Sequence, residues 1–211
     1  MPSPQGPAEP GNDAVAGARE QRKQTTRRGL EDAALRLFAR DGFDATTVEA
    51  ITEEAGVSPR TFFRYFASKE QVLSPERELR QALLREAVLA AADRGLPDLD
   101  VAVEALASIA AIFEPEREAM KLRRRAAASS VTLRGRLQDV LHSWQLALTA
   151  ALAERRESQD TDLQAEIAGA VAITLWQDAV QRWATDTEDA LDLAAHLRAA
   201  RSALGCRPRL G

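Results

Sequence analysis

Residues 45–66 read ATTVEAITEEAGVSPRTFFRYF and predict two short helices joined by a tight turn. Thr46 or Thr47 can cap the first helix, because a threonine hydroxyl accepts a hydrogen bond from a free backbone N–H group of the first turn. Gly56 allows the chain to reverse without steric strain. Ser58 caps the second helix, and the proline after it fits the first turn, where no N–H group is needed. This arrangement matches a helix-turn-helix.

The second of these helices carries two kinds of side chain on two faces. Phe62 and Phe66 lie one turn apart and predict a face that is buried against the core. The remaining side chains project outward and combine guanidinium, hydroxyl and aromatic groups, which suit guanine edges, phosphates and thymine methyls of DNA. These outward residues are Arg60, Thr61, Phe63, Arg64 and Tyr65, with Lys69 just beyond the helix as a phosphate ligand. An ordinary aromatic-rich amphipathic helix would explain the two buried rings but not an exposed Phe63.

A longer helix is predicted before this motif, over residues 25–41. Its apolar residues recur at the spacing of one buried face, and a glycine follows as a stop. They are Leu30, Ala34, Leu37 and Phe38, followed by Gly42. Residues 1–20 are rich in Pro, Gly and Ala without an apolar period and predict a disordered arm. Residues 19–28 hold five cations and one anion, which suits phosphates but is also common in a solvated arm.

Residues 40–70 resemble the DNA-binding domain of the TetR family of regulators. The shared pattern is a Gly-aromatic pair ahead of Thr-Thr, followed by Ile, Ala-Gly-Val-Ser, Thr, Tyr-Phe and Ser-Lys-Glu. The strong resemblance covers residues 27–73, and beyond it the chain matches only the length and helical character of the family. The Phe-Phe-Arg-Tyr-Phe segment is similar to a subgroup that includes regulators found near clusters for peptide-derived redox cofactors.

The resemblance implies a set of DNA contacts. Thr47 would contact a phosphate at the start of the first helix of the motif, and Lys69 would hold the DNA backbone. Arg64 is expected to reach a base edge or an adjacent phosphate beyond the usual set. Phe63 stands where many relatives have tyrosine, so a phosphate hydrogen bond is lost there. The residues assigned to the major groove are Ser58, Arg60, Thr61, Phe63 and Tyr65, and Pro59 is also counted among the DNA-binding residues.

The rest of the chain also predicts helices, so the expected fold class is all-α with about nine helices. One helix is kinked or restarts at Ser74-Pro75, and further helices are predicted at residues 98–113, 115–128, 131–157, 161–184 and 187–204. The expected organisation is a disordered arm (1–20), a helix-turn-helix DNA-binding domain (21–73), a helical ligand-binding and dimerisation domain (74–205) and a tail (206–211).

The helix over residues 161–184 is apolar around most of its surface, which requires burial on more than one side. The family resemblance implies that the last two helices pair with those of a second subunit, so a homodimer is expected. Ala165, Gly169 and Ala172 would permit close approach of the subunits. Burial within one subunit is the alternative. A dimer would present two recognition helices to operator half-sites about 34 to 36 Å apart, or multiples of that.

A small-molecule effector is expected to bind between the C-terminal helices. The candidate ligand-binding residues are Phe113, Met120, His142, Trp144 and Trp176, each of which could instead be ordinary core. The three arginines at residues 123–125 could favour an anionic ligand. Consecutive helical residues lie about 100° apart, however, so these arginines cannot form a single patch and at least one is expected to be solvated.

The composition fits a regulator better than an enzyme. The net charge is −4, yet residues 19–69 hold ten cations and eight anions and so net +2. No apolar run reaches the roughly 20 residues of a membrane span, and no signal segment is apparent, so a cytoplasmic protein with no membrane partner is expected. Asp139 and His142 could form half of a metal site, but His196 lacks an acidic residue three positions before it. The single cysteine, Cys206, is interpreted as an incidental tail thiol.

The sequence therefore predicts a sequence-specific DNA-binding transcription regulator. The expected mode of action is a repressor that an unknown small molecule releases from double-stranded operator DNA. No catalytic residue, metal or cofactor is assigned. A purely structural helical module would account for the C-terminal helices but not for Phe63 and Arg64 beside a basic arm.

Overall fold

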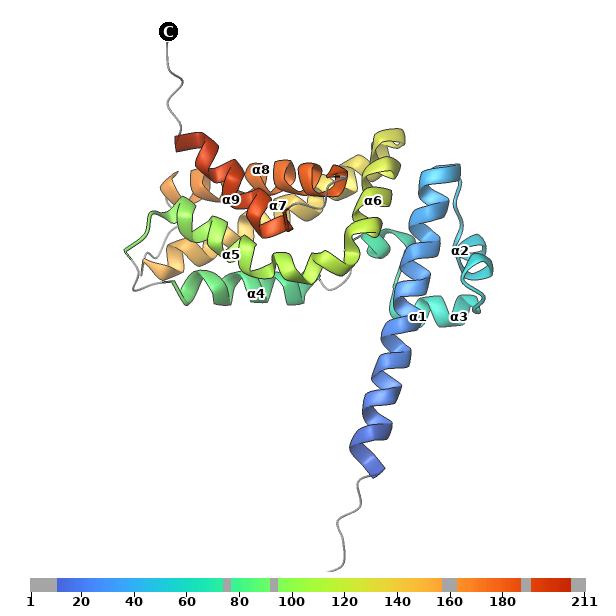
Figure 1. The fold of residues 1–211 in the computed structure, drawn as a ribbon. Helices are drawn as coiled ribbons and strands as arrows, with labels where there is room; N and C mark the ends of the chain where they lie inside the picture. The colour runs from blue at the N-terminus through green and yellow to red at the C-terminus, as the bar shows by residue number, and fades with distance from the viewer. Residues whose placement is uncertain (1–10, 74–76, 92–94, 157–162, 187–190, 206–211) are drawn as a thin grey trace, which may run out of the picture.

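The computed structural model describes residues 11–73, 77–91, 95–156, 163–186 and 191–205. Within these ranges the chain is helical and contains no β-strand, which confirms the all-α prediction (Figure 1). The elements are α1 (Gly11–Asp41), α2 (Val48–Glu54), α3 (Pro59–Tyr65), η1 (Lys69–Leu73), α4 (Arg77–Leu89), α5 (Asp98–Phe113), η3 (Glu114–Glu116), α6 (Arg117–Ser129), α7 (Val131–Arg155), α8 (Leu163–Thr185) and α9 (Leu193–Gly205). None of the helices in these ranges has the length and apolar character that crossing a membrane requires. The predicted restart at Ser74-Pro75 and Cys206 lie outside the described residues.

Helix α1 begins at Gly11, well before the start expected near residue 25. The prediction of a disordered arm therefore does not hold for residues 11–20, and residues 1–10 lie outside the described part of the chain. The prolines of the N-terminal segment end at Pro10, and the following ten residues mix three alanines, an arginine and a glutamate with poorer helix formers, among them Gly11 and Gly17. They extend a helix whose formation is already secured by the buried segment from Leu30 onward.

The local signals of the helix-turn-helix are confirmed. The Thr47 hydroxyl accepts a hydrogen bond from the backbone N–H of Ala50 at 3.1 Å. The Ser58 hydroxyl accepts one from the backbone N–H of Thr61 at 3.2 Å. Gly56 has a φ of 66°, in the left-handed region that a side chain disfavours. The turn between α2 and α3 therefore depends on a glycine at this position.

Two clusters of buried apolar side chains hold the helices together. The first packs α1, α2 and α3 around Phe38, Ile51 and Phe62, which are fully buried. The second lies among α4, α5, α7, α8 and α9. Helix α6 contributes Ala119 and Ala126 to the first cluster and stands between α1 and the other C-terminal helices (Figure 1). Helices α6 and α7 both reach the two parts of the molecule, α7 through Leu133 in the first cluster and Trp144 in the second.

Helices α7 and α8 approach closely where α8 has a glycine. A Cβ atom added at Gly169 would lie 2.6 Å from Thr149 Oγ1 and 3.3 Å from the carbonyl oxygen of Gln145, both in α7. Ala165 and Ala172 are fully buried within the same chain. The expectation that these small residues allow two subunits to approach is corrected, because their close packing is already used inside one chain.

The apolar surface of α8 is also mostly buried within one chain. The buried large residues are Ile173, Leu175, Trp176, Val180 and Trp183. Val171 is half-buried, and Ile167 is exposed at 54%. Helix α8 packs against α5, α6, α7 and α9, so burial within a single subunit accounts for most of its apolar character.

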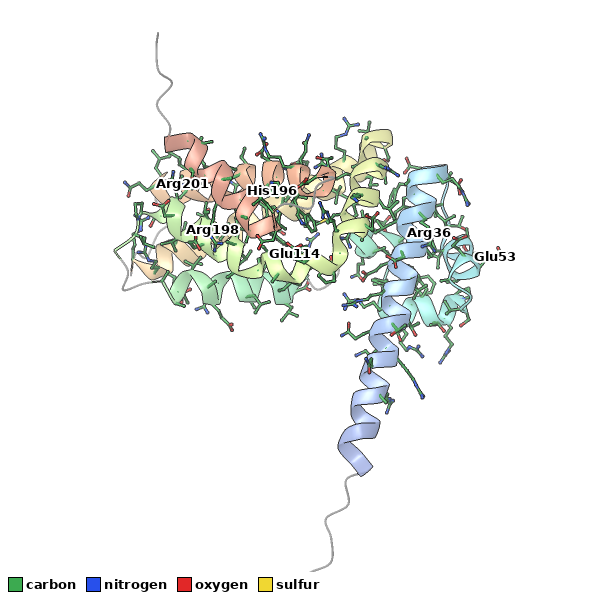
Figure 2. The ribbon with its side chains drawn as sticks, viewed as in Figure 1. Arg36, Glu53, Glu114, His196, Arg198 and Arg201 are labelled. Carbon is green, nitrogen blue, oxygen red and sulfur yellow. The ribbon has the colours of Figure 1, made fainter. Side chains whose placement is uncertain are left out.

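Polar contacts fasten α9 to the neighbouring helices, and Figure 2 labels two of the residues that make them, Glu114 and Arg198. The Glu114 carboxylate accepts hydrogen bonds from Trp183 Nε1 at 3.2 Å and from the backbone N–H of Leu193 at 2.8 Å. Arg198 Nη2 donates to Glu104 at 2.9 Å, which links α9 to α5. One carboxylate at the end of α5 therefore joins α8 and α9.

Candidate functional site

Helix α3 presents the predicted recognition face. The Phe63 ring is 56% exposed, whereas Phe62 and Phe66 on either side of it are 0% and 2% exposed. The other exposed residues of this segment are Ser58, Pro59, Arg60 and Arg64. A large apolar ring left in solvent beside cationic side chains indicates a contact surface rather than a core position.

Contacts within the segment hold its polar side chains in place. Arg64 lies over the Tyr65 ring, with its guanidinium carbon 5.0 Å from the ring centre, and Nη2 donates a hydrogen bond to the Tyr65 hydroxyl at 3.3 Å. The hydroxyls of Ser58 and Thr61 lie 3.1 Å apart. Tyr65 and Thr61 are half-buried, so they project outward less fully than predicted. Such ordering before binding reduces the side-chain entropy that is lost on contact with DNA.

Lys69 is held by the loop between α1 and α2. Its ammonium donates hydrogen bonds to the carbonyl oxygens of Phe43 at 2.7 Å and Thr46 at 2.9 Å. The Nζ atom also lies 4.4 Å from the centre of the Phe43 ring. A lysine ammonium has three donors, so at most one remains for the phosphate contact that the sequence predicts. The structure gives Lys69 a second role, which is to fix the loop that carries Thr47.

Further cations lie on the extended first half of α1. Arg19, Arg22 and Arg28 are exposed, and the first turns of α1 extend away from the other helices (Figure 1). Thr47, at the start of α2, is exposed as well. The predicted basic arm is therefore a helix, which holds its charges at fixed spacing beside the recognition segment.

A cavity of about 580 Å³ lies among the C-terminal helices. Its apolar wall includes Phe113, Trp144 and Trp176, whose ring centres are 5.3 to 5.9 Å apart. Met120 lines the same cavity. Four of the five predicted ligand-binding residues are thus brought together. The volume falls within the roughly 300 to 1,000 Å³ typical of ligand pockets.

The prediction is wrong for His142, which is exposed and does not line this cavity. Residues two apart are about 200° apart around a helix. Because Trp144 faces the cavity, His142 on the same helix faces solvent. The neighbouring prediction for the three arginines is confirmed: Arg123 is buried, Arg124 is half-buried and Arg125 is exposed.

Buried charges form a network, the buried charge cluster of Glu31, Arg80, Glu116 and Arg123. The Glu116 carboxylate accepts from Arg80 Nη2 at 2.7 Å and from Arg123 Nη1 at 3.3 Å. The side chains of Arg80 and Arg123 are only 6% and 4% exposed. Burial raises the pKa of the Glu31 carboxyl above its ordinary value of 4.5, while the charges of Arg123 and Arg27 act in the opposite direction. Glu116 therefore links α4 to α6, and Glu31 of α1 lies near enough for the charge of Arg123 to act on its carboxyl.

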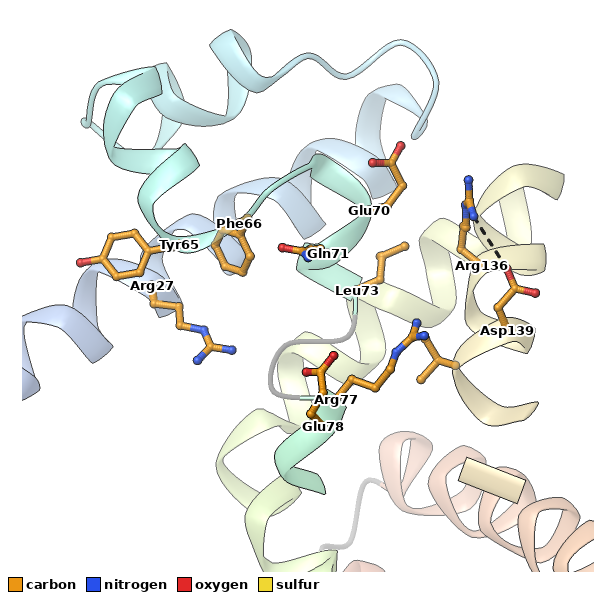
Figure 3. A pocket seen from close by; sticks show the side chains of 11 residues that line it. Arg27, Tyr65, Phe66, Glu70, Gln71, Leu73, Arg77, Glu78, Arg136 and Asp139 are labelled. Carbon is orange, nitrogen blue, oxygen red and sulfur yellow. Dashed lines mark ion pairs between the residues drawn. The ribbon is translucent and has the colours of Figure 1, made fainter. Parts of the chain in front are cut away.

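A second hollow, of about 550 Å³, separates the helix-turn-helix from the C-terminal helices (Figure 3). Arg27, Tyr65 and Phe66 line one side of it. The other side includes Arg136 and Asp139, whose charged groups lie 3.9 Å apart. Direct packing between the two parts runs instead through α6, which lies against α1, and through the start of α7, which lies against η1.

The geometry of the recognition segment agrees with comparisons to known proteins. Residues 30–74 match the family model described as bacterial regulatory proteins, tetR family. Residues 30–74 therefore form a DNA-binding domain of the tetR type. The chain is 48% identical to the transcriptional regulator TcmR of Streptomyces glaucescens over 69 residues, which cover 32% of the chain and 30% of TcmR. It is 26% identical to MftR of Mycobacterium tuberculosis, named as a mycofactocin biosynthesis regulator, over 87% of the chain and 91% of MftR.

Solved structures extend the likeness beyond the DNA-binding segment. Thermus thermophilus FadR, a TetR-family repressor solved in complex with lauroyl-CoA, is 25% identical with a TM-score of 0.50, over 88% of this chain and 99% of FadR. A regulator from Aquifex aeolicus has a TM-score of 0.51 at 17% identity, over 85% of this chain and 98% of that one, and shows the shared fold alone. These relatives are all named as transcriptional regulators, which agrees with the DNA-binding role that the family match over residues 30–74 indicates.

Sequence reasoning missed the buried charge cluster. Glu31 directly follows Leu30 on a helix whose apolar face was identified, but no local signal marks its carboxyl as buried. Arg80 and Glu116 are 36 residues apart in sequence. Only the packing of α4, η3 and α6 brings these groups together.

Proposed function

We propose that this regulator is a homodimeric repressor that a small molecule releases from its operator. The supporting observation is that α6 belongs to both parts of the molecule. Ala119 and Ala126 pack into the cluster of the helix-turn-helix, whereas Met120 and Arg123 line the C-terminal cavity. A ligand that moves α6 would therefore move the helix-turn-helix with it.

In this proposal α3 enters the major groove of double-stranded DNA. Phe63 contacts thymine methyl groups, and Arg60 and Arg64 contact a base edge or phosphates. Thr47 and the exposed arginines of α1 contact the phosphate backbone, which fixes orientation without reading sequence. The remaining donor of Lys69 adds a phosphate contact.

A second copy of the chain completes the operator-binding unit. One short helix reads only a few base pairs, and two copies related by a two-fold axis read two half-sites. Large apolar side chains remain exposed on α8 and α9, and they support pairing through these helices. These residues are Leu163, Ile167 and Leu204, at 70%, 54% and 59% exposure.

Effector binding works against DNA binding by changing the spacing of the two recognition helices. The cavity is lined by α4, α6, α7 and α8, and α6 packs on α1. Occupation of the cavity shifts α6, which carries α1 and the attached α3 out of register with the second half-site. The FadR relative, a repressor solved in complex with lauroyl-CoA, supports a ligand-responsive mode of action for this regulator.

Fluorescence anisotropy across a salt series tests the DNA contacts. The labelled duplexes are DNA from upstream of the protein's own gene and duplexes that the protein selects from a random library, with a scrambled duplex for comparison. We expect sequence-selective binding that weakens steeply with salt, because phosphate contacts release counterions. The double variant Phe63→Ala/Arg64→Ala should bind about a hundredfold more weakly, because each contact contributes roughly 1 to 3 kcal/mol.

The matched control is Arg182→Ala, an exposed arginine on α8. It removes the same charge from the surface at a distance from α3 and should leave operator affinity unchanged. An equal loss of operator affinity in Arg182→Ala and in Phe63→Ala/Arg64→Ala would mean that DNA binding depends only on the net charge of the protein. Failure to select any sequence from the library, or selection that the double variant retains in full, would refute the proposed recognition face.

A further inference from the structure

The C-terminal cavity combines an apolar wall with an excess of positive charge. Its lining includes the rings of Phe113, Trp144 and Trp176. Four arginines also line it: Arg80, Arg123, Arg124 and Arg134. The carboxylate among the lining residues is that of Asp178, which already pairs with Arg182 at 2.7 Å. Arg80 and Arg123 share the Glu116 carboxylate, so the cavity wall still carries more cationic than anionic groups.

Arg123 is the cation best placed to receive a ligand. Its side chain is 96% buried, since only 4% is exposed. One nitrogen, Nη1, is used by Glu116 at 3.3 Å and by the Met120 sulfur at 3.6 Å. Among the described residues, neither Nε nor Nη2 of Arg123 has a hydrogen-bond acceptor. Donors buried in this way are costly unless an acceptor is supplied.

Trp144 adds a second donor to the same wall. Its side chain is buried, and its indole Nε1 likewise has no acceptor within the described part of the chain. Buried tryptophan N–H groups normally find a partner. Both side chains line one cavity, whereas the unmatched nitrogens themselves are buried, so a ligand acceptor reaches them when these side chains turn toward the cavity.

We propose that the cavity binds an amphipathic carboxylate, with its anionic group at Arg123 and its apolar body against the three aromatic rings. This inference rests on the proposed effector role of the cavity and names the chemical class of the effector. The ligand carboxylate accepts hydrogen bonds from Arg123 Nε and Nη2, where a guanidinium presents two donors in a fixed fork. The apolar body is held by burial against the rings and Met120.

The charge of the ligand also gives it a route to the DNA-binding helices. Glu116 and the ligand carboxylate share the Arg123 guanidinium, and Glu31 on α1 is attracted to the same charge. A second anion at Arg123 weakens the electrostatic attraction between the Arg123 guanidinium and the Glu31 carboxyl of α1. A neutral ligand of equal size fills the cavity without this electrostatic effect.

The test compares decanoate with 1-decanol at pH 7.5, using full-length protein. Binding is followed by tryptophan fluorescence, because Trp144 and Trp176 line the cavity. We expect decanoate to bind about tenfold to a hundredfold more tightly than decanol, the range given by charge-assisted hydrogen bonds to a buried cation. Arg123→Met should remove this preference and leave the affinity for decanol unchanged.

Two design features separate the ligand site from a folding defect. Arg123→Met keeps a long side chain and leaves Glu116 paired with Arg80, so the variant should fold, which circular dichroism checks. Arg125→Met removes a charge from the exposed face of the same helix and should keep the full preference for decanoate.

Parallel anisotropy with the selected operator duplex distinguishes this inference from the proposed function. A preference for decanoate that Arg123→Met abolishes supports the carboxylate site, whether or not decanoate releases DNA. If decanoate binds there without releasing DNA, the proposed effector-controlled release is wrong and the site stands. Equal binding of the acid and the alcohol, no binding of either, or a preference that Arg123→Met retains would overturn the carboxylate site, while operator recognition is judged separately by its own variants.

Discussion

Replacing Glu116 with glutamine should destabilise the protein by about 3 kcal/mol. Its carboxylate compensates two guanidinium groups, those of Arg80 and Arg123, at 2.7 and 3.3 Å. Removing one member of a buried ion pair typically costs about 3 to 5 kcal/mol, because a charge is left uncompensated. The Glu116 side chain is itself 22% exposed, so water offsets part of the loss and the lower end of that range applies.

Urea unfolding followed by circular dichroism at 222 nm measures this change. For a domain of this size, about 3 kcal/mol corresponds to a fall in Tm of roughly 6 to 12 °C. The matched control is Glu118→Gln, two residues away, whose side chain is 81% exposed and pairs with Lys121 at 2.6 Å. We expect no measurable change in this control, because exposed ion pairs contribute little.

Equal stability of Glu116→Gln and Glu118→Gln would refute the buried charge cluster as a stabilising link. A larger loss in Glu118→Gln would also contradict it. Both variants remove one negative charge from adjacent turns, so a difference between them reports burial and pairing rather than net charge.

Three further outcomes are expected. Gly169→Ala should lower the free energy of unfolding by about 1 to 2 kcal/mol, because overpacking against Thr149 Oγ1 at 2.6 Å outweighs the gain in helix propensity. Adding Thr149→Ala to this variant should restore most of the lost stability. An unchanged free energy of unfolding in Gly169→Ala alone would contradict the packing of α7 against α8. Phe62→Ala should cost about 3 to 5 kcal/mol, because the ring is fully buried; a loss below about 1 kcal/mol in urea unfolding would argue against its place in the core. Burial raises the pKa of the Glu31 carboxyl above 4.5, so the contribution of Glu31 to stability is fully present below pH 4.5 and is lost as the pH rises through the folded-state pKa. The variant Glu31→Gln should lack this fall in the free energy of unfolding when unfolding is measured across a pH series. Identical pH profiles of the variant and the parent protein would show that the carboxyl titrates normally.

The helix-turn-helix was predictable from sequence because its determinants are local. The cap formed by Thr47 involves a residue three positions away, as does the cap formed by Ser58. Gly56 is required by the backbone conformation of its own residue. Such signals depend on short stretches of chain, so they can be interpreted without knowing how distant segments pack.

The C-terminal site was only partly predictable. Apolar periodicity identified Phe113, Trp144 and Trp176 as inward-facing, but it placed His142 in the same group although that residue is exposed. The extended start of α1 was missed for a different reason. Residues 11–20 have no apolar face, and half of them are Gly, Asn, Asp or Val, so neither periodicity nor helix propensity indicates a helix there. The helix continues backward from the buried segment that begins at Leu30.

The sequence by itself therefore determined the all-helical class, the position of the helix-turn-helix and the chemistry of its exposed face, since each depends on residues within a few positions of one another. Tertiary structure alone decided which arginine is buried, which small residues α8 uses against α7, and how Glu31 meets the charges of α4, η3 and α6. The physical reason is that burial and charge compensation depend on the neighbours that packing supplies, and Arg80 and Glu116 become neighbours only when helices 36 residues apart in sequence are brought together.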